Sequence, residues 1–334
     1  MVDVSRLGQT QATGDTQELF LKVFAGEVLS TFQEANKFMP LHMTRTISSG
    51  KSAQFPVIGT AAAHWHTPGE SVITDNDAGN ASYLSQVKHA EREIFIDDCL
   101  VSSVLIDDLD ALKNHYDHRS AYSQAIGRAL AKEADEHVLA SLLAASLATA
   151  NIPNVTAAGA NVAVIDMVVN KSVLISGAFS AAEILDGNDC PKEDRYMAVR
   201  PAQYYLLAQD NALVNRDFGG ANGVYSDGTV LKVAGFTIVQ TNNMPADTVN
   251  NSAVADSGAR NDVGGTAGVG YNLDWRNVEA LCFHKSAAGT VKMADLQVMS
   301  EYQVERLANL LLAKYAMGHS YLRPEACVAL KDVD

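Results

Sequence analysis

The feature that most constrains this 334-residue chain is a long stretch almost free of helix-breaking residues. No proline occurs between Pro68 and Pro153, and Gly127 is the only glycine from residue 80 to residue 158. Apolar residues recur there at intervals of three and four, which is the spacing of one helix face. The pattern predicts a single helix from about Asp107 to Ser146, roughly 60 Å long at 1.5 Å per residue.

Three carboxylates stand where this helix is expected to begin. Asp107, Asp108 and Asp110 suit a helix N-terminus, because carboxylates there accept hydrogen bonds from free amides and complement the helix dipole. Helices longer than about 25 residues are usually coiled coils, membrane spans or structural spines. The heptads of this one are irregular and its polar residues exclude a membrane span, so the sequence predicts a spine.

The segment Thr60–His89 is unusual for a compact domain. It opens on small residues, continues through His64-Trp65-His66, and reaches a polar tip that contains Asp75 and Asp77. Extended stretches flank this tip, which predicts a loop or long hairpin of about 30 residues. Loops of that length in compact domains are usually functional or disordered.

Local patterns predict the remaining elements. The first 16 residues are polar, lack the apolar core of a secretory signal, and indicate an arm on a chain that matures in a cytoplasm. The other expected elements are a helix over Glu18–Phe32, an extended segment over Ala53–Ile58, a helix over Val162–Leu185, a strand over Tyr196–Val199, a helix from Pro201 to about Gln209, a strand over Val230–Gln240, an exposed loop over Ala246–Gly270, strands over Val278–Phe283 and Gly289–Met299, and an apolar run over Leu310–Met317. Together they predict an α+β protein with an inserted domain at about 154–276.

The charge balance excludes some partners. The chain has 39 Asp and Glu against 25 Lys and Arg, a net charge of −14. Such a protein has no excess of cations to displace counterions from phosphates, so we expect only weak, non-specific contact with DNA and no binding to anionic membranes. Charged residues are 19% of the chain, below the roughly 25% of soluble proteins. The low value suggests that much of the surface is covered.

No catalytic, cofactor-binding or metal-binding motif is visible. The four cysteines are far apart, so neither a disulfide framework nor a zinc site is expected, and reduced, packed thiols are the better interpretation. His64 and His66 would share a face of a strand, but nothing nearby supplies the further ligands that zinc needs. Solvated or packing histidines are therefore favoured, and the sequence predicts that the chain is not an enzyme.

Several segments resemble the major capsid proteins of T-seven-like short-tailed phages (podoviruses), which have the Hong Kong 97-type fold. These segments lie toward both ends of the chain and cover about half of it. They are Glu18–Leu29, Ile47–Pro56, Asn114–Asp117 with Arg119 and Ser120, His284–Ala287, Ala313–His319 and Leu322–Ala326.

The resemblance implies a division of the chain into five parts. Residues 1–58 would be an N-terminal arm and 59–92 an extended loop that reaches across a neighbouring subunit. Residues 93–153 would be a peripheral domain with the spine helix, 154–276 an axial domain near the capsomer centre, and 277–334 the closing strands of the peripheral domain. Trp65, Glu70, Asp75 and Asp77 are then the expected contacts with the neighbour, although a solvated tip without a role is an equal alternative for the three carboxylates.

The implied function is structural: hexamers and pentamers that close an icosahedral shell around a double-stranded DNA genome. The implied partners are other copies of the chain, a scaffolding protein during assembly and a portal at one vertex, with assembly in the bacterial host cytoplasm and residence in the virion capsid. One alternative is an encapsulin-like nanocompartment, which shares the fold but encloses enzymes. The other is a cytosolic α/β enzyme whose site cannot be identified from the sequence.

Overall fold

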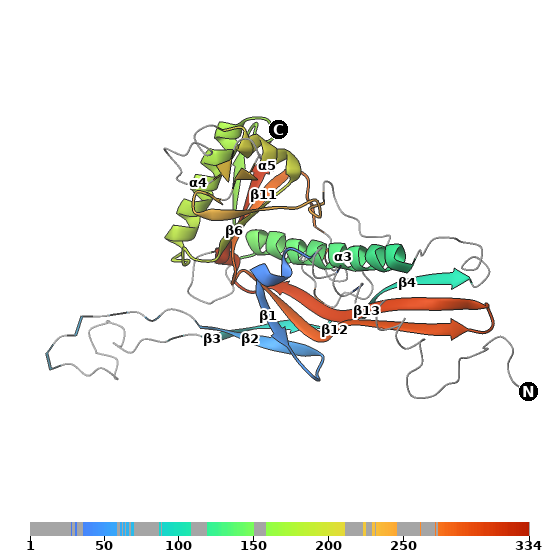
Figure 1. Cartoon of the computed structure of the whole chain (residues 1–334). Helices are drawn as coiled ribbons and strands as arrows, with labels where there is room; N and C mark the ends of the chain where they lie inside the picture. Colours follow the sequence, from blue (N-terminus) through green and yellow to red (C-terminus); the bar gives the residue numbers. More distant parts are fainter. Residues whose placement is uncertain are drawn as a thin grey trace, which may run out of the picture.

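The computed structural model describes residues 36–58, 89–107, 119–149, 158–210, 232–245 and 273–333. It also describes two short strands, β7 (Gly223–Val224) and β8 (Thr229–Val230), and the single positions 28, 31, 61, 63, 65, 66, 68, 69, 87, 261 and 271. These residues form a six-stranded sheet with two helices, a four-stranded sheet, and a long helix that runs between the two sheets (Figure 1). The α+β class that the sequence predicts is confirmed.

The four-stranded sheet has the order β1-β12-β13-β4. Its strands are β1 (Met43–Thr46), β12 (Ala288–Gln303), β13 (Ala308–Tyr321) and β4 (Leu100–Asp107). Strands β12 and β13 form one long antiparallel hairpin that, together with β4, extends beyond the described helix beside it (Figure 1). Strand β1 lies parallel to β12, and β4 lies antiparallel to β13.

The spine helix α3 (Arg119–Leu147) links the two halves of the molecule. Ile126 and Leu130, near its start, pack with Leu311 and Tyr315 against the four-stranded sheet. The stretch from Val138 onward belongs instead to the larger core, which it shares with the six-stranded sheet. Because one rigid helix contributes to both cores, it fixes the two sheets relative to each other.

The six-stranded sheet has the order β5-β14-β11-β6-β10-β9. Its strands are β5 (Ala160–Val164), β14 (Cys327–Asp332), β11 (Val278–His284), β6 (Arg195–Val199), β10 (Phe236–Gln240) and β9 (Lys232–Val233). Helices α4 (Lys171–Gly187) and α5 (Pro201–Ala208) complete this half. Since β11 and β14 pair with strands from 154–276, the division that the sequence placed at residue 276 runs through this sheet.

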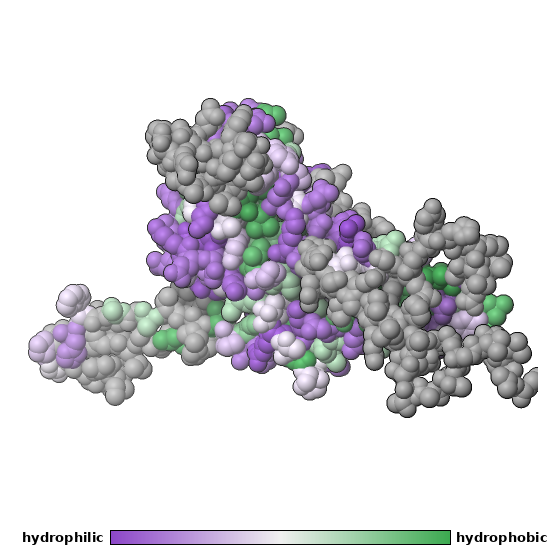
Figure 2. All heavy atoms as spheres, viewed as in Figure 1, coloured by the Kyte–Doolittle hydropathy of each residue, from purple (hydrophilic) through white to green (hydrophobic). Residues whose placement is uncertain are grey.

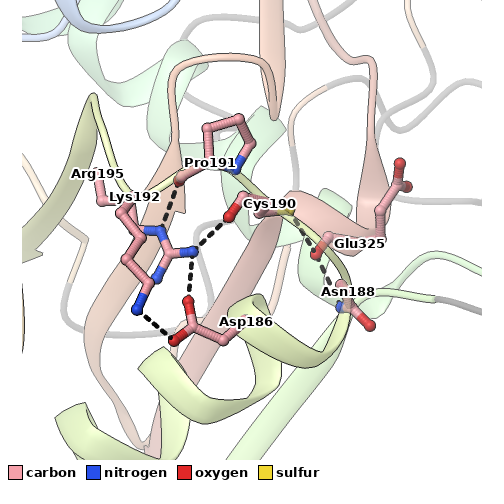
Figure 3. A network of polar contacts seen from close by, with 7 residues as sticks. All are labelled: Asp186, Asn188, Cys190, Pro191, Lys192, Arg195 and Glu325. Carbon is pink, nitrogen blue, oxygen red and sulfur yellow. Dashed lines mark hydrogen bonds and ion pairs between the residues drawn. The ribbon is translucent and has the colours of Figure 1, made fainter.

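A network of polar contacts fixes the end of α4 to the neighbouring elements (Figure 3). The guanidinium of Arg195, at the start of β6, donates from Nη2 to Asp186 Oδ1 at 2.7 Å and to the Cys190 carbonyl at 2.6 Å. Its Nε donates to the Pro191 carbonyl at 2.8 Å. Asn188 then donates from Nδ2 to the carbonyl of Glu325 at 2.9 Å, in the short helix η5 (Pro324–Ala326). The network joins α4, β6 and the turn before β14.

For three of the elements predicted from the sequence, the predicted boundaries are wrong. The spine helix does not begin at Asp107, because Asp107 ends strand β4 and the described helix starts at Arg119. Val162 lies in strand β5, and the helix predicted to start there begins at Lys171. The strand predicted over Val230–Gln240 is broken by a turn at Ala234-Gly235, where both residues have positive φ.

The first error has a simple physical cause. Strand β4 alternates between half-buried and exposed residues, as a strand covered on one face must. Leu105 is on the exposed face, yet its spacing to the apolar residues beyond it also fits a helix. Asp107 is therefore a strand residue, and Asp108 and Asp110 lie outside the described residues.

The other predictions stand as follows. Strands β6, β11 and β12 and helix α5, which has Pro201 in its first turn, occur where they were expected. The apolar run Leu310–Met317 lies in β13. Of the helix predicted over Glu18–Phe32 only Val28 and Thr31 are described, and both are helical and buried. Of the predicted exposed loop Ala246–Gly270 only Asn261 is described, and it is buried, contrary to the prediction.

Candidate assembly surfaces

A two-stranded hairpin projects from the body at the end opposite the β12–β13 hairpin (Figure 1). It consists of β2 (Ser52–Ile58) and β3 (His89–Phe95), paired antiparallel from Ser52–Phe95 to Ile58–His89. The extended segment that the sequence predicted over Ala53–Ile58 lies in β2, whereas most of the predicted loop Thr60–His89 lies outside the described residues. An isolated two-stranded hairpin is at best marginally stable in water, so this one needs support at its root and along its length.

The support at the root is a small apolar cluster. Ala53 and Ile94 pack there with Val291 of β12 and Leu322, and all four are buried. Beside the cluster, the Arg92 guanidinium lies over the ring of Tyr321 at 4.0 Å. Toward its far end the described part of the hairpin carries exposed residues, among them Pro56 and Glu91. The body therefore supports only the root.

All described residues between the end of β2 and the start of β3 are exposed. Trp65 is 99% exposed, an extreme value for the side chain that gains most from burial. Among the predicted contact residues, Trp65 thus lies on an accessible surface, whereas Glu70, Asp75 and Asp77 lie outside the described residues. His66 is exposed, and His64 lies outside the described residues.

A second accessible surface is the outward face of the four-stranded sheet, on the side opposite α3. The strand registers place Leu105 beside Leu310, and Leu312 beside Met299. Leu105 and Met299 are both more than 40% exposed. Half-buried Leu310 and Leu312 lie between them, so a row of apolar side chains crosses three strands. The sequence prediction missed this face because it placed Leu105 on a helix.

The far end of the β12–β13 hairpin is also apolar. Val304 and Leu307, in the turn between the strands, are 73% and 62% exposed. Apolar residues are visible at this end in Figure 2, whereas hydrophilic residues dominate the described surface of the half that carries the six-stranded sheet. A hairpin of this length with an apolar end is suited to contact another protein surface.

Titratable groups with shifted pKa values lie mainly inside the protein rather than on these surfaces. Burial raises the pKa of Asp135 on α3 to about 6. Its carboxylate accepts hydrogen bonds from the backbone amides of Lys37 and Phe38, both at 3.2 Å, and from Asn243 Nδ2 at 3.0 Å. Asp135 therefore holds the segment before β1 against the spine and has a structural role.

Within the described residues no cluster of His, Cys, Asp and Glu is arranged to hold a metal ion. All four cysteines are free, with Cys190, Cys282 and Cys327 buried and Cys99 exposed. Burial raises the pKa of the three buried thiols, which disfavours the reactive thiolate. No described helix is long and apolar enough to cross a membrane.

Comparison with known proteins places these surfaces in context. The chain is 34% identical over 333 residues to the major capsid protein of Escherichia phage T7, covering 96% of this chain and 93% of the relative. It is 33% identical to the major capsid protein of Enterobacteria phage T3, covering 97% and 94%. These relatives are structural proteins, so the prediction that the chain is not an enzyme is confirmed.

Solved structures agree with the sequence relatives. The capsid of cyanophage P-SCSP1u is similar with a TM-score of 0.76 and 37% identity, covering 99% of both chains. A virus-like particle from Pyrococcus furiosus is similar with a TM-score of 0.56 but 12% identity, which shows only a shared fold. The family model Gp10A-like, described as major capsid protein, matches residues 54–331. The chain belongs to the Gp10A-like family of major capsid proteins.

Proposed function

We propose that this capsid protein forms hexamers and pentamers that close an icosahedral shell around a double-stranded DNA genome. The observation that carries the proposal is the β2–β3 hairpin, which is buried only at its root and leads to the exposed Trp65. Aromatic side chains bury about 150–250 Å² each and dominate interface energetics. A neighbouring subunit in a shell supplies the surface that the hairpin lacks.

The contact residues follow from this arrangement. Trp65 is proposed as the apolar anchor of the extended loop on the neighbour. Glu70, Asp75 and Asp77 are proposed to meet cations on the same neighbour, because burying carboxylates without partners costs several kcal/mol per ion. Each exposed ion pair is worth at most about 1 kcal/mol, but a closed shell repeats it at every subunit.

The two halves of the molecule are proposed to have different places in the capsomer. The half with the six-stranded sheet, including β11 and β14 as well as the elements of 158–245, is proposed as the axial part. The half with α3 and the four-stranded sheet is proposed as the peripheral part. The outward face of that sheet and the β12–β13 hairpin are then available to neighbouring subunits.

The other proposed partners are a scaffolding protein during assembly in the bacterial host cytoplasm and a portal at one vertex. The net charge of −14 supports weak, non-specific contact with packaged DNA rather than tight binding.

The test is expression of the full chain with and without a scaffolding protein, followed by sedimentation and negative-stain microscopy. We expect closed particles from the wild type and unassembled, folded subunits from Trp65→Ser. The matched control is Phe179→Ser, because Phe179 is 59% exposed on α4, an element of the other half of the molecule. A wild type that stays a single 36 kDa species at micromolar concentration with scaffold present would contradict the shell. Normal assembly of Trp65→Ser would contradict only the proposed contact of the extended loop, and the shell itself would remain supported.

A further inference from the structure

Three histidines lie close together inside the molecule, on three segments that are distant in the sequence. His42 directly precedes β1, His137 is on α3, and His319 is on β13. His42 and His319 are almost completely buried. The His137 ring stacks on Tyr271 with centroids 4.2 Å apart, and its centroid is 5.9 Å from that of His319. The proposed assembly surfaces do not include this cluster.

One carbonyl group determines how the protons are arranged. His42 Nδ1 is 2.8 Å from the Phe38 carbonyl, which can only accept, so Nδ1 carries the proton and Nε2 of the neutral ring accepts. The Thr290 hydroxyl is 2.5 Å from His42 Nε2 and must donate to it. Thr290 Oγ1 is also 2.8 Å from His319 Nδ1, from which it accepts.

This arrangement of protons leaves Nε2 of His319 without a hydrogen-bond partner among the described residues. With its proton on Nδ1, its Nε2 is a bare acceptor, and it is buried with no hydrogen-bond partner among the described residues. A second proton on His319 would go to this atom, where no described group accepts it. A second proton on His42 would go to Nε2, which could then no longer accept from Thr290, so the Thr290 hydroxyl proton would lose its acceptor. Both additions disrupt the chain of hydrogen bonds.

The chain continues to the root of the β2–β3 hairpin. The backbone amide of His319 donates to the Tyr271 hydroxyl at 3.0 Å, and this hydroxyl donates to Asp97 Oδ2 at 2.5 Å. Asn261 donates from Nδ2 to Asp97 Oδ1 at 3.3 Å and to the Phe95 carbonyl at 2.6 Å. Its Oδ1 accepts from the Phe95 amide at 2.9 Å. Phe95 is the last residue of β3.

We propose that these residues form a latch that fixes the root of the β2–β3 hairpin to β13, and that protonation of its histidines opens it. The latch consists of His42, Thr290, His319, Tyr271, Asp97 and Asn261. The inference concerns the single subunit and does not depend on shell formation.

The charges around the histidines support this direction. Burial is the main cause that lowers the pKa of His42 to about 4, and the cations Lys292 and Lys285 add to it. Burial also lowers the pKa of His319 well below its usual value, with contributions from His137, His42 and Lys292. The carboxylate in the latch is Asp97, whose Oδ2 accepts from the Tyr271 hydroxyl. On α3, Asp135 is bound to the segment before β1.

His42 and His319 therefore resist protonation while the latch is closed and can be protonated when it is open. Opening returns each histidine toward a pKa of about 6.5, so acid favours the open state by about tenfold per pH unit below that value for each histidine released.

The experiment is hydrogen–deuterium exchange of the full-length, unassembled chain at pH 7, 6 and 5, corrected for the intrinsic pH dependence of exchange. We expect protection of residues 89–95 to fall about 25-fold between pH 7 and pH 5 for one released histidine, while residues 278–284 of β11 keep theirs. Asn261→Ala should expose residues 89–95 to exchange already at pH 7.

Two histidine variants separate the latch from a general effect of acid. In His319→Asn the amide nitrogen can replace the Nδ1 donor but takes up no proton, so the pH dependence of residues 89–95 should shrink. His284→Asn is the control, because His284 lies on β11 and its Nδ1 is likewise 2.8 Å from a hydroxyl. In this variant the pH dependence of residues 89–95 should stay as in the wild type. Equal loss of protection in all strands at pH 5, or full protection of residues 89–95 in Asn261→Ala, would overturn the proposal. If His319→Asn does not fold, hydrogen–deuterium exchange of the wild type and of Asn261→Ala still tests the proposal.

Discussion

Asn261 binds both backbone groups of Phe95: its Nδ2 donates to the carbonyl at 2.6 Å and its Oδ1 accepts from the amide at 2.9 Å. One side chain thus pairs with the end of β3 as a neighbouring strand would. Gly318 of β13 lies directly against the same carbonyl, because a Cβ there would be 1.8 Å from Phe95 O and 3.1 Å from Asn261 Nδ2. Asn261 and Gly318 thus both contact the backbone at the root of the β2–β3 hairpin.

Gly318→Ala should therefore destabilise the subunit strongly. The added methyl group would meet backbone, which cannot move as a flexible side chain can, and overpacking of this kind costs about 1–3 kcal/mol or more. The control is Gly187→Ala at the end of α4, where a Cβ meets nothing within 4 Å. Urea denaturation should show a lower midpoint for Gly318→Ala and a midpoint for Gly187→Ala close to the wild type. Equal midpoints for the two variants would mean that β3 does not depend on this close contact.

The sequence predicted those elements whose signals are local. Pro201 marks the first turn of α5 because its missing amide costs nothing there, and the strands β6 and β11 are short apolar runs. The extended segment Ala53–Ile58 was also recognisable from a local pattern, and it lies in β2. The family was recognisable from segments toward both ends of the chain that resemble it, and the comparisons confirm the family.

The remaining features depend on partners far away in the chain. Asn261 stands in a stretch rich in Asn, Asp, Ala and Gly, which by composition predicts an exposed loop, and its partner Phe95 is 166 residues away. The two histidines of the latch, His42 and His319, stand near opposite ends of the chain, so no spacing rule could have grouped them. The outward apolar face was hidden because the helical and alternating patterns overlap at Leu105.

Arg195→Lys should lower stability although it conserves the charge. The guanidinium serves Asp186 and the carbonyls of Cys190 and Pro191 with separate N–H groups, and a lysine ammonium cannot reach all three. Each lost hydrogen bond in this buried site costs about 1 kcal/mol, and more where an acceptor stays unpaired.

The control for this prediction is Arg276→Lys. Arg276 pairs with Asp274 on the surface, where both side chains are at least half exposed, so its replacement should change the free energy of unfolding by less than about 1 kcal/mol. Urea denaturation of both variants at pH 7 makes the comparison. A larger loss in Arg276→Lys than in Arg195→Lys would show that the network in Figure 3 contributes little.

The free energy of unfolding should fall as the pH falls from about 6.5 toward 4. The pKa values of His42 and His137 are lowered to about 4, mainly by burial, so over this range the unfolded chain binds protons that the folded chain excludes. At pH 5 each such histidine costs about 2 kcal/mol relative to pH 7. Asp135 acts in the opposite direction, because its raised pKa of about 6 lets the folded chain hold a proton there.

Glu136 and Glu279, whose pKa values burial also raises, add to the effect of Asp135, whereas His319 and His284, whose pKa values burial lowers, add to that of His42 and His137. We expect the four histidines to dominate, so that the free energy of unfolding increases with pH. Urea denaturation at pH 7, 6 and 5 measures it, and Asp135→Asn should steepen the slope because it removes the opposing contribution. A free energy of unfolding that stays constant or rises toward pH 5 would contradict the assignment of neutral, buried histidines.

The last prediction concerns the outward face of the four-stranded sheet. Leu105→Glu and Met299→Glu should leave the subunit folded, because both side chains are more than 40% exposed, but should reduce the yield of closed shells. A carboxylate placed in an apolar contact without a partner costs several kcal/mol, and a shell repeats that cost at every subunit. Sucrose-gradient sedimentation of co-expressed chain and scaffolding protein gives the yield, and circular dichroism confirms folding.

The control adds the same charge elsewhere. Ser176→Glu places a carboxylate on the exposed face of α4, so it changes the net charge of −14 by the same amount as the other two variants. If assembly responds only to total charge, all three variants lose shells equally. If the row of apolar side chains across β4, β13 and β12 is a contact between subunits, Leu105→Glu and Met299→Glu lose shells while Ser176→Glu does not. Wild-type yields from all three would leave this face exposed in the finished shell.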